Sequence, residues 1–307
     1  MLMYNGVIVV NKEKGFTSHD VVAKLRGILK QKKIGHTGTL DPDATGVLPV
    51  CLGNATKLCD MLTDKDKTYE AVLLLGQSTD TQDISGKIIN SVDVMEIREA
   101  GKLEDEKILD TINGFVGLYS QVPPMYSALK VGGKKLYELA REGIEIERQP
   151  RMVTIYSIEN VVIDYPRVRM EVSCSKGTYI RTLCHDIGEK LGTYGCMESL
   201  KRTKVSTFCL EEAKTLDEIA DLVMDGQIEK QIVSVETIFG DYRAMKTKPE
   251  FDKYIYNGNS LYEHTVDIKN ATDGEKFRVY DSKDIFMGIF AYSKKERRYK
   301  CEKMFLS

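Results

Sequence analysis

The sequence predicts an α+β fold: a mixed, largely antiparallel sheet with flanking helices, followed by a small β-rich domain at the C-terminus. Segments with strand-like and helix-like apolar spacing are interspersed without the regular βαβ rhythm of a parallel sheet. The chain of 307 residues is long enough for two domains with a buried core. From about residue 241 it changes to short strand candidates separated by turn residues. We therefore expect domains at residues 1–240 and 241–307.

The N-terminal part predicts a strand, a helix and a structured loop, in that order. Residues 6–11 form a β-branched run followed by a glycine turn, which is typical of a strand. Thr17 and Asp20 fit a capping box, and apolar residues at helical spacing then continue to about Lys30. Residues 35–46 contain three glycines and a proline, so they cannot form a continuous helix or a central strand. We expect this segment to be a loop.

The middle of the chain alternates between predicted strands and helices. Residues 69–75 predict a strand, and residues 103–112 predict a helix that ends at a glycine. Apolar and polar residues alternate strictly over 168–174, which indicates a half-buried strand. Residues 178–191 place four apolar side chains on one helical face. Residues 215–226 begin with a capping box and end at a glycine, so they predict a further helix.

The C-terminal segment contains three strand candidates at residues 276–280, 286–292 and 303–306. Asp-Gly and Ser-Lys-Asp sequences between them are typical of turns. A small β-rich domain follows from this pattern.

Composition excludes several classes of protein. No run of about eighteen apolar residues could span a membrane, and the first residues lack the charged start of a secretion signal, so we expect a cytoplasmic protein. The seven cysteines form no Cys-x-x-Cys pair, which argues for reduced thiols and against a zinc site. With 44 basic and 46 acidic side chains the net charge is −2, so the total charge does not indicate a nucleic-acid binder.

The charge is nevertheless segregated along the chain. Residues 12–33 carry seven basic and two acidic side chains, a net charge of +5. Residues 294–303 carry six basic and two acidic side chains, a net charge of +4, whereas residues 93–107 have a net charge of −3. Each run fits either a solvated helix face or a surface that binds phosphates, and the charges alone leave both interpretations open.

The loop at residues 35–46 is the densest candidate for chemistry. For an arbitrary loop of this composition, aspartates that cap backbone amides are the default interpretation. A calcium loop is excluded because Leu52 stands where a bidentate glutamate is required. The loop also lacks the Gly-Lys-Ser/Thr end of a nucleotide phosphate cradle, and the chain contains no His-Glu-x-x-His or Gly-x-Ser-x-Gly motif.

Four segments carry motifs that can be recognised together. They are GHTGTLDPDATGVLPV at 35–50, KTY at 67–69 with GQSTDTQD at 76–83, QVPPMYSALK at 121–130 and CSKGTYIRTL at 174–183. In this order and separation they resemble the TruB family of bacterial pseudouridine synthases over most of residues 4–210. The C-terminal segment resembles a PUA-type RNA-binding module more loosely.

The resemblance implies an enzyme that isomerises uridine 55 in the T-loop of tRNA to pseudouridine, by flipping the base and without a cofactor or metal. It implies that Asp41 is the catalytic aspartate, with Tyr69 and Arg181 in its immediate surroundings. It also implies a set of residues that line or support the substrate pocket: His36, Tyr69, Asp83, Tyr179 and Leu200. The expected partner is the T-arm of tRNA, bound by a monomer that does not associate with membranes.

The chemistry itself explains why such residues are needed. The reaction needs an ionised carboxylate near the ribose, and a guanidinium from Arg181 beside Asp41 would lower its pKa. Tyr69 could stack on the flipped base and assist removal of its C5 proton, and an apolar lining that includes Leu200 would keep the site dry. Whether the carboxylate attacks covalently or promotes elimination through a glycal stays open. Lys12 is followed by Glu13, where the family commonly has Lys-Pro, which puts in doubt the rigidity of this turn and not the activity.

Two alternatives stay open at this point. The chain could be a non-catalytic tRNA-binding or folding module in which Asp41 only caps a loop. It could also be a pseudouridine synthase for another RNA position.

Overall fold

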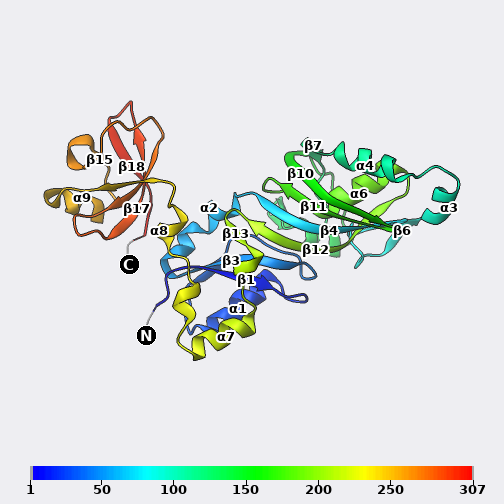
Figure 1. The fold of residues 1–307 in the computed structure, drawn as a ribbon, viewed down its shortest axis with the longest axis horizontal. Coiled ribbons are helices and arrows are strands. Elements are labelled where there is room, and N and C mark those ends of the chain that lie inside the picture. Colours follow the sequence, from blue (N-terminus) through cyan, green and yellow to red (C-terminus); the bar gives the residue numbers. More distant parts are fainter. Residues whose placement is uncertain (1–2, 306–307) are drawn as a thin grey trace.

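The computed structural model describes residues 3–305, which form two large sheets with helices packed against them (Figure 1). The molecule is elongated. The C-terminal sheet lies at one end, the N-terminal strands lie in the middle, and helices α3 (Val94–Glu99) and α4 (Asp105–Asn113) lie at the other end (Figure 1). None of the helices described is long and apolar enough to cross a membrane.

The larger sheet has nine strands. They are β1 (Gly6–Lys12), β2 (Ile34–His36), β3 (Thr45–Leu52), β4 (Lys67–Leu75), β7 (Gly117–Gln121), β10 (Arg151–Asp164), β11 (Arg167–Cys174), β12 (Gly195–Val205) and β13 (Phe208–Cys209). Seven of them follow one another in the order β1-β3-β12-β4-β11-β10-β7, while β2 pairs with β3 and β13 with β12. Strands β3 and β12 run parallel and the other pairs are antiparallel. The sheet is therefore mixed and largely antiparallel, as predicted.

Three apolar clusters hold helices against this sheet. Helices α1 (Ser18–Ile28) and α7 (Leu216–Met224) cover one face of β1 and β3. Helices α4 and α6 (Ile180–Leu191) pack against β4, β10 and β11. The third cluster covers the other face of β1 and β3 and draws on short helices: η1 (Gly53–Leu58), α2 (Cys59–Thr63) and α8 (Val235–Ile238).

The C-terminal sheet has five strands in the order β14-β16-β17-β18-β15: β14 (Arg243–Lys246), β15 (Leu261–Tyr262), β16 (Lys276–Tyr280), β17 (Phe286–Ser293) and β18 (Arg298–Met304). Its own core is apolar, and Ile289 of β17 and Phe305 also pack with Val7 and Val9 of β1. The two sheets thus share one apolar cluster. Further short helices lie between residues 210 and 265: η2 (Leu210–Glu212), η3 (Ile228–Gln231), η4 (Pro249–Phe251), α9 (Asp252–Tyr256) and η5 (Glu263–Thr265).

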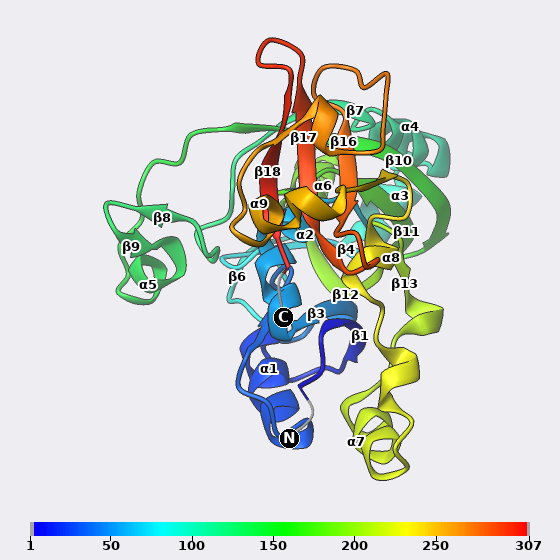
Figure 2. The same cartoon turned by 90° about the vertical axis from the view of Figure 1, so that its left-hand side faces the viewer.

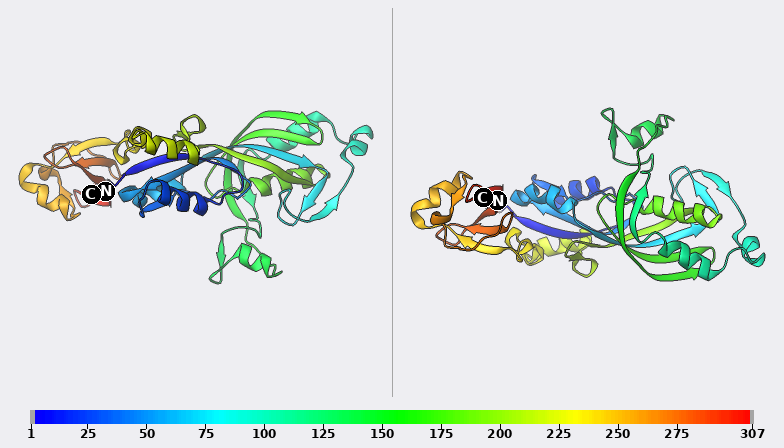
Figure 3. Two further views of the ribbon diagram at one scale, coloured as in Figure 1. Left: turned by 90° about the horizontal axis from the view of Figure 1, so that it is seen from below. Right: turned by 90° about the horizontal axis from the view of Figure 1, so that it is seen from above.

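Two hairpins extend from the larger sheet. Strands β5 (Gln77–Thr79) and β6 (Ile88–Ser91) form the first, which follows β4 directly. Strands β8 (Lys130–Val131) and β9 (Lys134–Lys135) form the second, and helix α5 (Leu136–Arg141) continues it. Figures 2 and 3 show that the second hairpin and α5 project well away from the rest of the chain.

The predicted helices are confirmed. They could be predicted because the residues that begin and end a helix lie close together in the sequence. Thr17 accepts a hydrogen bond from the backbone amide of Asp20, and the carboxylate of Asp20 caps the Thr17 amide in return. The same reciprocal pair is formed by Thr215 and Glu218 at the start of α7. Gly192 ends α6 with a φ of 73°, a conformation that glycine adopts at little cost.

The strands were predicted less completely. The last strand was expected at residues 303–306, but β18 begins at Arg298 and ends at Met304, and residue 306 lies outside the part of the chain that the structure describes. In the larger sheet, strands β2, β3, β7, β10, β12 and β13 were not predicted, and the longest of these are β10 and β12. Both contain register shifts, at 155–157 and 159–162 in β10 and at 197–199 and 202–204 in β12. A shift of this kind breaks the two-residue alternation that identifies a strand in a sequence.

Candidate active site

The loop that carries Asp41 connects β2 to β3, and the N-terminal segment holds it in place. The carbonyl of Pro42 accepts hydrogen bonds from the backbone amide of Gly15 at 2.9 Å and from Nζ of Lys12 at 3.0 Å. The amide of Leu40 donates to the hydroxyl of Ser18, at the start of α1, at 2.9 Å. The loop is therefore fixed on both sides of Asp41.

The end of this loop has no room for a side chain. Gly46 has a φ of 100°, and a Cβ at this position would lie 2.2 Å from the carbonyl oxygen of Arg202 on β12. Only glycine allows the backbones of β3 and β12 to approach so closely. This contact brings the loop against the strand that also carries Leu200.

Arg181, in the first turn of α6, reaches across to Asp41. Its Nε lies 3.0 Å from Oδ2 of Asp41 and its Nη2 lies 3.3 Å from Oδ1, so the guanidinium grips both carboxylate oxygens. Nη2 also donates to the carbonyl of Tyr126 at 2.9 Å. The Arg181 side chain is only 8% exposed, and its geometry is fixed by protein on all of these sides.

Asp83 supports Arg181 from behind. Its Oδ2 lies 3.7 Å from Nη1 of Arg181, and the same nitrogen donates to the carbonyl of Thr81 at 3.3 Å. The Asp83 carboxylate also accepts hydrogen bonds from the hydroxyl of Thr81 at 2.7 Å and from the amide of Ser85 at 3.0 Å. Arg181 thus lies between two carboxylates, that of Asp83, which is held by further hydrogen bonds, and that of Asp41, which is partly exposed.

The electrostatic balance at Asp41 differs from the expectation. Burial raises the pKa of Asp41, and this effect outweighs the Arg181 guanidinium, which lowers it. Asp83 and Asp43 raise the pKa further. The Asp41 side chain is nevertheless 41% exposed, so the carboxylate is not dry in the protein alone. Arg181 therefore lowers the pKa as expected, but desolvation by the surrounding protein exceeds the attraction to this one arginine.

Tyr69 lies on β4 and is 8% exposed. Burial raises the pKa of its phenol, and the Arg202 guanidinium opposes this through its charge and a hydrogen-bonding contact. The Asp41 carboxylate is close enough to add to the rise. Tyr69 is therefore near Asp41, as expected, and it is also near the buried cation of Arg202.

Tyr179, Leu200 and His36 occupy different positions around this centre. Tyr179 precedes α6, and Gln121 fixes its backbone with two hydrogen bonds, of 2.8 Å to its amide and 3.0 Å from the amide group of Gln121 to its carbonyl. Leu200 of β12 is partly buried against the same apolar cluster as Tyr69. His36 ends β2, and its Nδ1 accepts from the amide of Gly38 at 3.4 Å.

His36 is the least connected of the predicted residues. Its nearest ring is His19 of α1, with ring centroids 5.1 Å apart in an edge-to-face arrangement. Burial and the neighbouring His19 and Arg202 charges lower the pKa of His36, which favours the neutral ring. Asp41, Asp83, Arg181, Tyr69 and Tyr179 are linked by contacts or by charge, whereas His36 interacts with His19 and Arg202 instead.

Sequence reasoning missed two buried cations next to this site. Lys12 is 0% exposed, and its Nζ donates to the carbonyls of Glu13, Phe16 and Pro42 at 2.6 to 3.0 Å. Arg202 is 2% exposed. The sequence signals for Lys12 were its place in a basic run and at the Lys-Pro position of the family, and neither indicates burial. Arg202 had no signal, because nothing local shows that a charged strand residue is buried.

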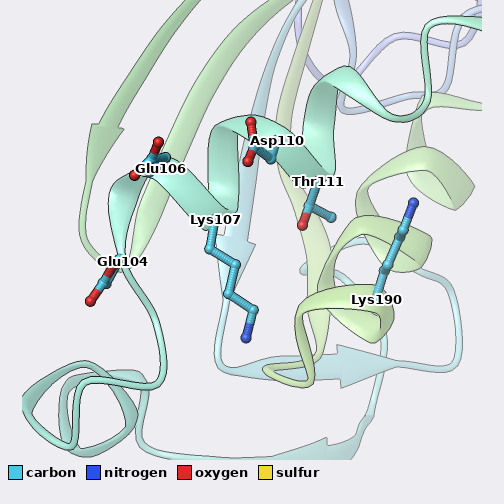
Figure 4. A pocket seen from close by; sticks show the side chains of 6 residues that line it. All are labelled: Glu104, Glu106, Lys107, Asp110, Thr111 and Lys190. Carbon is cyan, nitrogen blue, oxygen red and sulfur yellow. The ribbon is translucent and has the colours of Figure 1, made fainter.

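The pocket shown in Figure 4 lies elsewhere, between α4 and α6. It has a volume of about 390 Å³ and is lined by side chains of both charges: Glu104, Glu106, Lys107, Asp110, Thr111 and Lys190. None of the predicted site residues lines it. Within residues 3–305, no three His, Cys, Asp or Glu side chains are grouped as metal ligands would be.

Comparison with known proteins places the chain among enzymes of one kind. Residues 26–180 match the family described as TruB family pseudouridylate synthase (N terminal domain), and residues 181–239 match the tRNA pseudouridylate synthase B C-terminal domain. The protein called tRNA pseudouridine synthase B of Lachnoclostridium phytofermentans is 53% identical, over 98% of this chain and 100% of the relative. That of Bacillus licheniformis is 47% identical, over 91% of this chain and 90% of the relative.

A solved structure has a similar fold. The "Structure of H/ACA RNP bound to a substrate RNA containing 2'-deoxyuridine" contains a chain that is 25% identical, with a TM-score of 0.72 over 98% of this chain and 85% of that one. The fold, the motifs and the two family domains agree with one another. The chain belongs to the TruB family of pseudouridylate synthases.

Proposed function

We propose that this chain converts uridine 55 in the T-loop of tRNA to pseudouridine at the Asp41 site. The observation that carries the proposal is the pairing of Asp41 with a buried Arg181 through both carboxylate oxygens, at 3.0 and 3.3 Å. A carboxylate aimed in this way can act on the ribose carbon as a nucleophile or as a base. Membership of the TruB family, and the name tRNA pseudouridine synthase B of its relatives, support the reaction and the substrate.

The neighbouring side chains have separate tasks in this proposal. Arg181 keeps Asp41 ionised and oriented, and Asp83 orients Arg181. Tyr69 stacks on the flipped base, which returns on the order of 1 to 3 kcal/mol of the cost of unstacking. His36, Tyr179 and Leu200 line the pocket. Since Asp41 is 41% exposed, the bound RNA itself has to exclude water from the reacting carbon.

The reaction also requires a proton exchange on the base. The C1′–N1 bond breaks, the base turns, and C5 bonds to C1′. C5 then has to lose its proton while N1 gains one. We assign this exchange to the phenol of Tyr69, which gives its proton to N1 and takes the proton of C5, so that the enzyme ends the cycle unchanged.

The rest of the chain supplies surfaces for RNA. The projecting hairpin and α5 carry Lys130, Lys135 and Arg141, and their position beyond the sheet suits a grip on an RNA stem (Figure 2). We propose that residues 1–240 form the catalytic domain and residues 241–307 a PUA-like RNA-binding domain. We further propose that the protein acts as a monomer in the cytoplasm; a measured solution mass of twice 34.7 kDa would contradict the first point.

The test is release of tritium from C5-labelled uridine in unmodified tRNA. We expect release from wild-type protein, and none from a tRNA in which uridine 55 is replaced. Asp41→Asn should slow release by at least about 10⁴-fold, the scale typical of a lost nucleophile, with tRNA binding nearly unchanged. Asp43→Asn is the matched control, since this exposed aspartate is two residues away in the same loop.

The outcomes separate the alternatives. Full activity of Asp41→Asn would refute the role of this residue. Tight tRNA binding by a wild-type protein that releases no tritium would support a tRNA-binding or folding module instead. Release that persists after replacement of uridine 55 would indicate another RNA position.

A further inference from the structure

A row of side chains crosses four neighbouring strands next to the Asp41 loop. In the sheet register, Lys12 of β1 is opposite Gly46 of β3, which is opposite Arg202 of β12. Arg202 is in turn opposite Tyr69 of β4. Side chains directly opposite each other in a sheet point to the same face. Lys12, Arg202 and Tyr69 therefore lie along one line on one face.

Arg202 is a buried cation in the middle of this row. Its Nε donates to the carbonyl of Val47 at 2.8 Å, and it forms no ion pair with any carboxylate among residues 3–305. Its Nη2 is buried and has no hydrogen-bond partner within the same residues. A buried donor without an acceptor is rare in native proteins and calls for an explanation, since it costs stability.

The surroundings of Arg202 add to the positive charge. Lys12 and Lys67 are both buried, and each has its pKa lowered to about 8, first by burial and then with a contribution from the Arg202 charge. His36 is also within range of this charge. Lys12 and Lys67 therefore add positive charge near Arg202, and no carboxylate within residues 3–305 forms an ion pair with it.

Tyr69 is the group that faces this charge. Three groups act on its phenol from the elements packed around it: Arg202 on β12, Cys174 on β11 and Asp41 in the loop. Burial, Cys174 and Asp41 disfavour negative charge on the phenol oxygen, and Arg202 favours it. Among these groups, only Arg202 favours negative charge on the phenol oxygen.

We propose that Arg202 is a positioning residue that acts through Tyr69, by fixing the phenol and stabilising negative charge on its oxygen during the proton exchange. This inference rests on the proposed function. In that exchange the phenol gives its proton to N1; the C5–H bond then breaks, its electron pair returns to the pyrimidine ring, and the proton goes to the phenol oxygen. Because a charged oxygen is a stronger acceptor than a neutral phenol, the Arg202 guanidinium bonds the phenolate more strongly than the phenol. An interaction that strengthens only during the reaction raises the rate without tightening binding.

The test is a double-mutant cycle of Arg202→Gln and Tyr69→Phe, measured as the single-turnover rate of pseudouridine formation with saturating unmodified tRNA. We expect Arg202→Gln to slow the wild-type rate by about 100-fold, the scale of one lost preorganised donor. In the Tyr69→Phe background the same change should slow the rate less than about threefold, since the coupled group is gone. The Kd for tRNA should not change in either background. Arg202→Lys, which keeps the charge, should recover most of the rate.

Controls separate this role from a structural one. Lys204→Gln removes a charge from an exposed position of the same strand and should leave the cycle unchanged. Circular dichroism checks that each variant is folded; if Arg202→Gln does not fold, the same cycle is run with Arg202→Lys, whose smaller loss of rate must also disappear in Tyr69→Phe. Equal slowing in both backgrounds, or a rise in Kd that accounts for the lost rate, overturns the proposal. A wild-type protein without any activity would instead refute the proposed function before a variant is measured.

Discussion

The arginines around the C-terminal sheet and two buried cations near Asp41 have different kinds of partner. In the C-terminal sheet, Arg243 pairs with Glu275 at 2.9 Å, and Arg297 pairs with Glu263 at 2.8 Å. Next to Asp41, Lys12 donates to three backbone carbonyls and Arg202 to one. The first group is exposed and neutralised by carboxylates. The second is buried and keeps its charge for whatever lies in the site.

This difference shows that a count of charges along the chain does not identify a binding surface. The run at 294–303 has a net charge of +4, but Arg298 and Lys300 both pair with Glu296 inside that run. Exposed ion pairs of this kind produce only a weak electrostatic potential at a distance, and they contribute little to stability. Lys12 and Arg202 form no ion pair within residues 3–305, and their charges act on the site at short range in a buried environment.

Arg181 combines the two kinds of cation, because it is buried and is also paired with two carboxylates. We expect its removal to have the largest effect. We expect Arg181→Met to lower the single-turnover rate by about 10²- to 10³-fold, as for other lost preorganised charges. Burial already raises the pKa of Asp41 and Arg181 lowers it, so the variant leaves a carboxylate with a still higher pKa. Since the ionised form is the active one, the loss should be larger at acidic than at neutral pH.

The measurement is the rate of pseudouridine formation as a function of pH for wild type, Arg181→Met and Arg181→Lys. Arg181→Lys retains a charge and should keep the acidic limb of the profile closer to that of wild type. Profiles of identical shape for all three proteins would show that Arg181 does not control the ionisation of Asp41.

Lys12 is one of the two buried cations near Asp41, and we expect it to have an effect of intermediate size on the stability of the protein. Its pKa is lowered from 10.5 to about 8, so between these values the unfolded chain holds a proton that the folded chain has released. Folding therefore becomes more favourable as pH rises through this window. Relative to Lys12→Met, wild type should gain about 1 to 3 kcal/mol of unfolding free energy across it.

Urea unfolding of both proteins at several pH values measures this gain. Cysteines of the unfolded chain also titrate in this range, but their contributions are common to both proteins and cancel in the difference. Lys14→Met, at an exposed position nearby, is the control and should show no such gain. A difference between wild type and Lys12→Met that does not vary with pH would contradict the assignment of a buried ammonium.

The exposed pairs of the C-terminal sheet should give the smallest effect. Arg297→Gln removes the partner of Glu263, but both side chains are exposed, at 78% and 39%. We expect the thermal midpoint to stay within the error of the measurement, because pairs of this kind contribute little. The affinity for tRNA should also change little. A marked, salt-dependent loss of affinity would show that this arginine binds phosphate and that its pairing with Glu263 is exchanged for RNA.

Much of the fold was predictable because its signals are local. The capping boxes at Thr17 and Thr215 and the glycine after α6 each depend on residues a few positions apart, and they placed three helices correctly. The strict alternation of apolar and polar residues in β11 likewise predicted that strand correctly. The motif around Asp41 and that around Arg181 could be recognised as a family pattern, but their 3.0 Å contact joins residues 140 positions apart.

The sequence by itself determined those helices and strands whose signals lie within one turn or one strand. It also determined the family motifs and the change to short strand candidates near residue 241. Only the tertiary structure decided the register of the strands, and with it the row of Lys12, Arg202 and Tyr69. It also decided the raised pKa of Asp41. The physical reason is the same in each case: burial and charge act through space, so they depend on which distant segments a sheet brings together, and no short stretch of sequence contains that information.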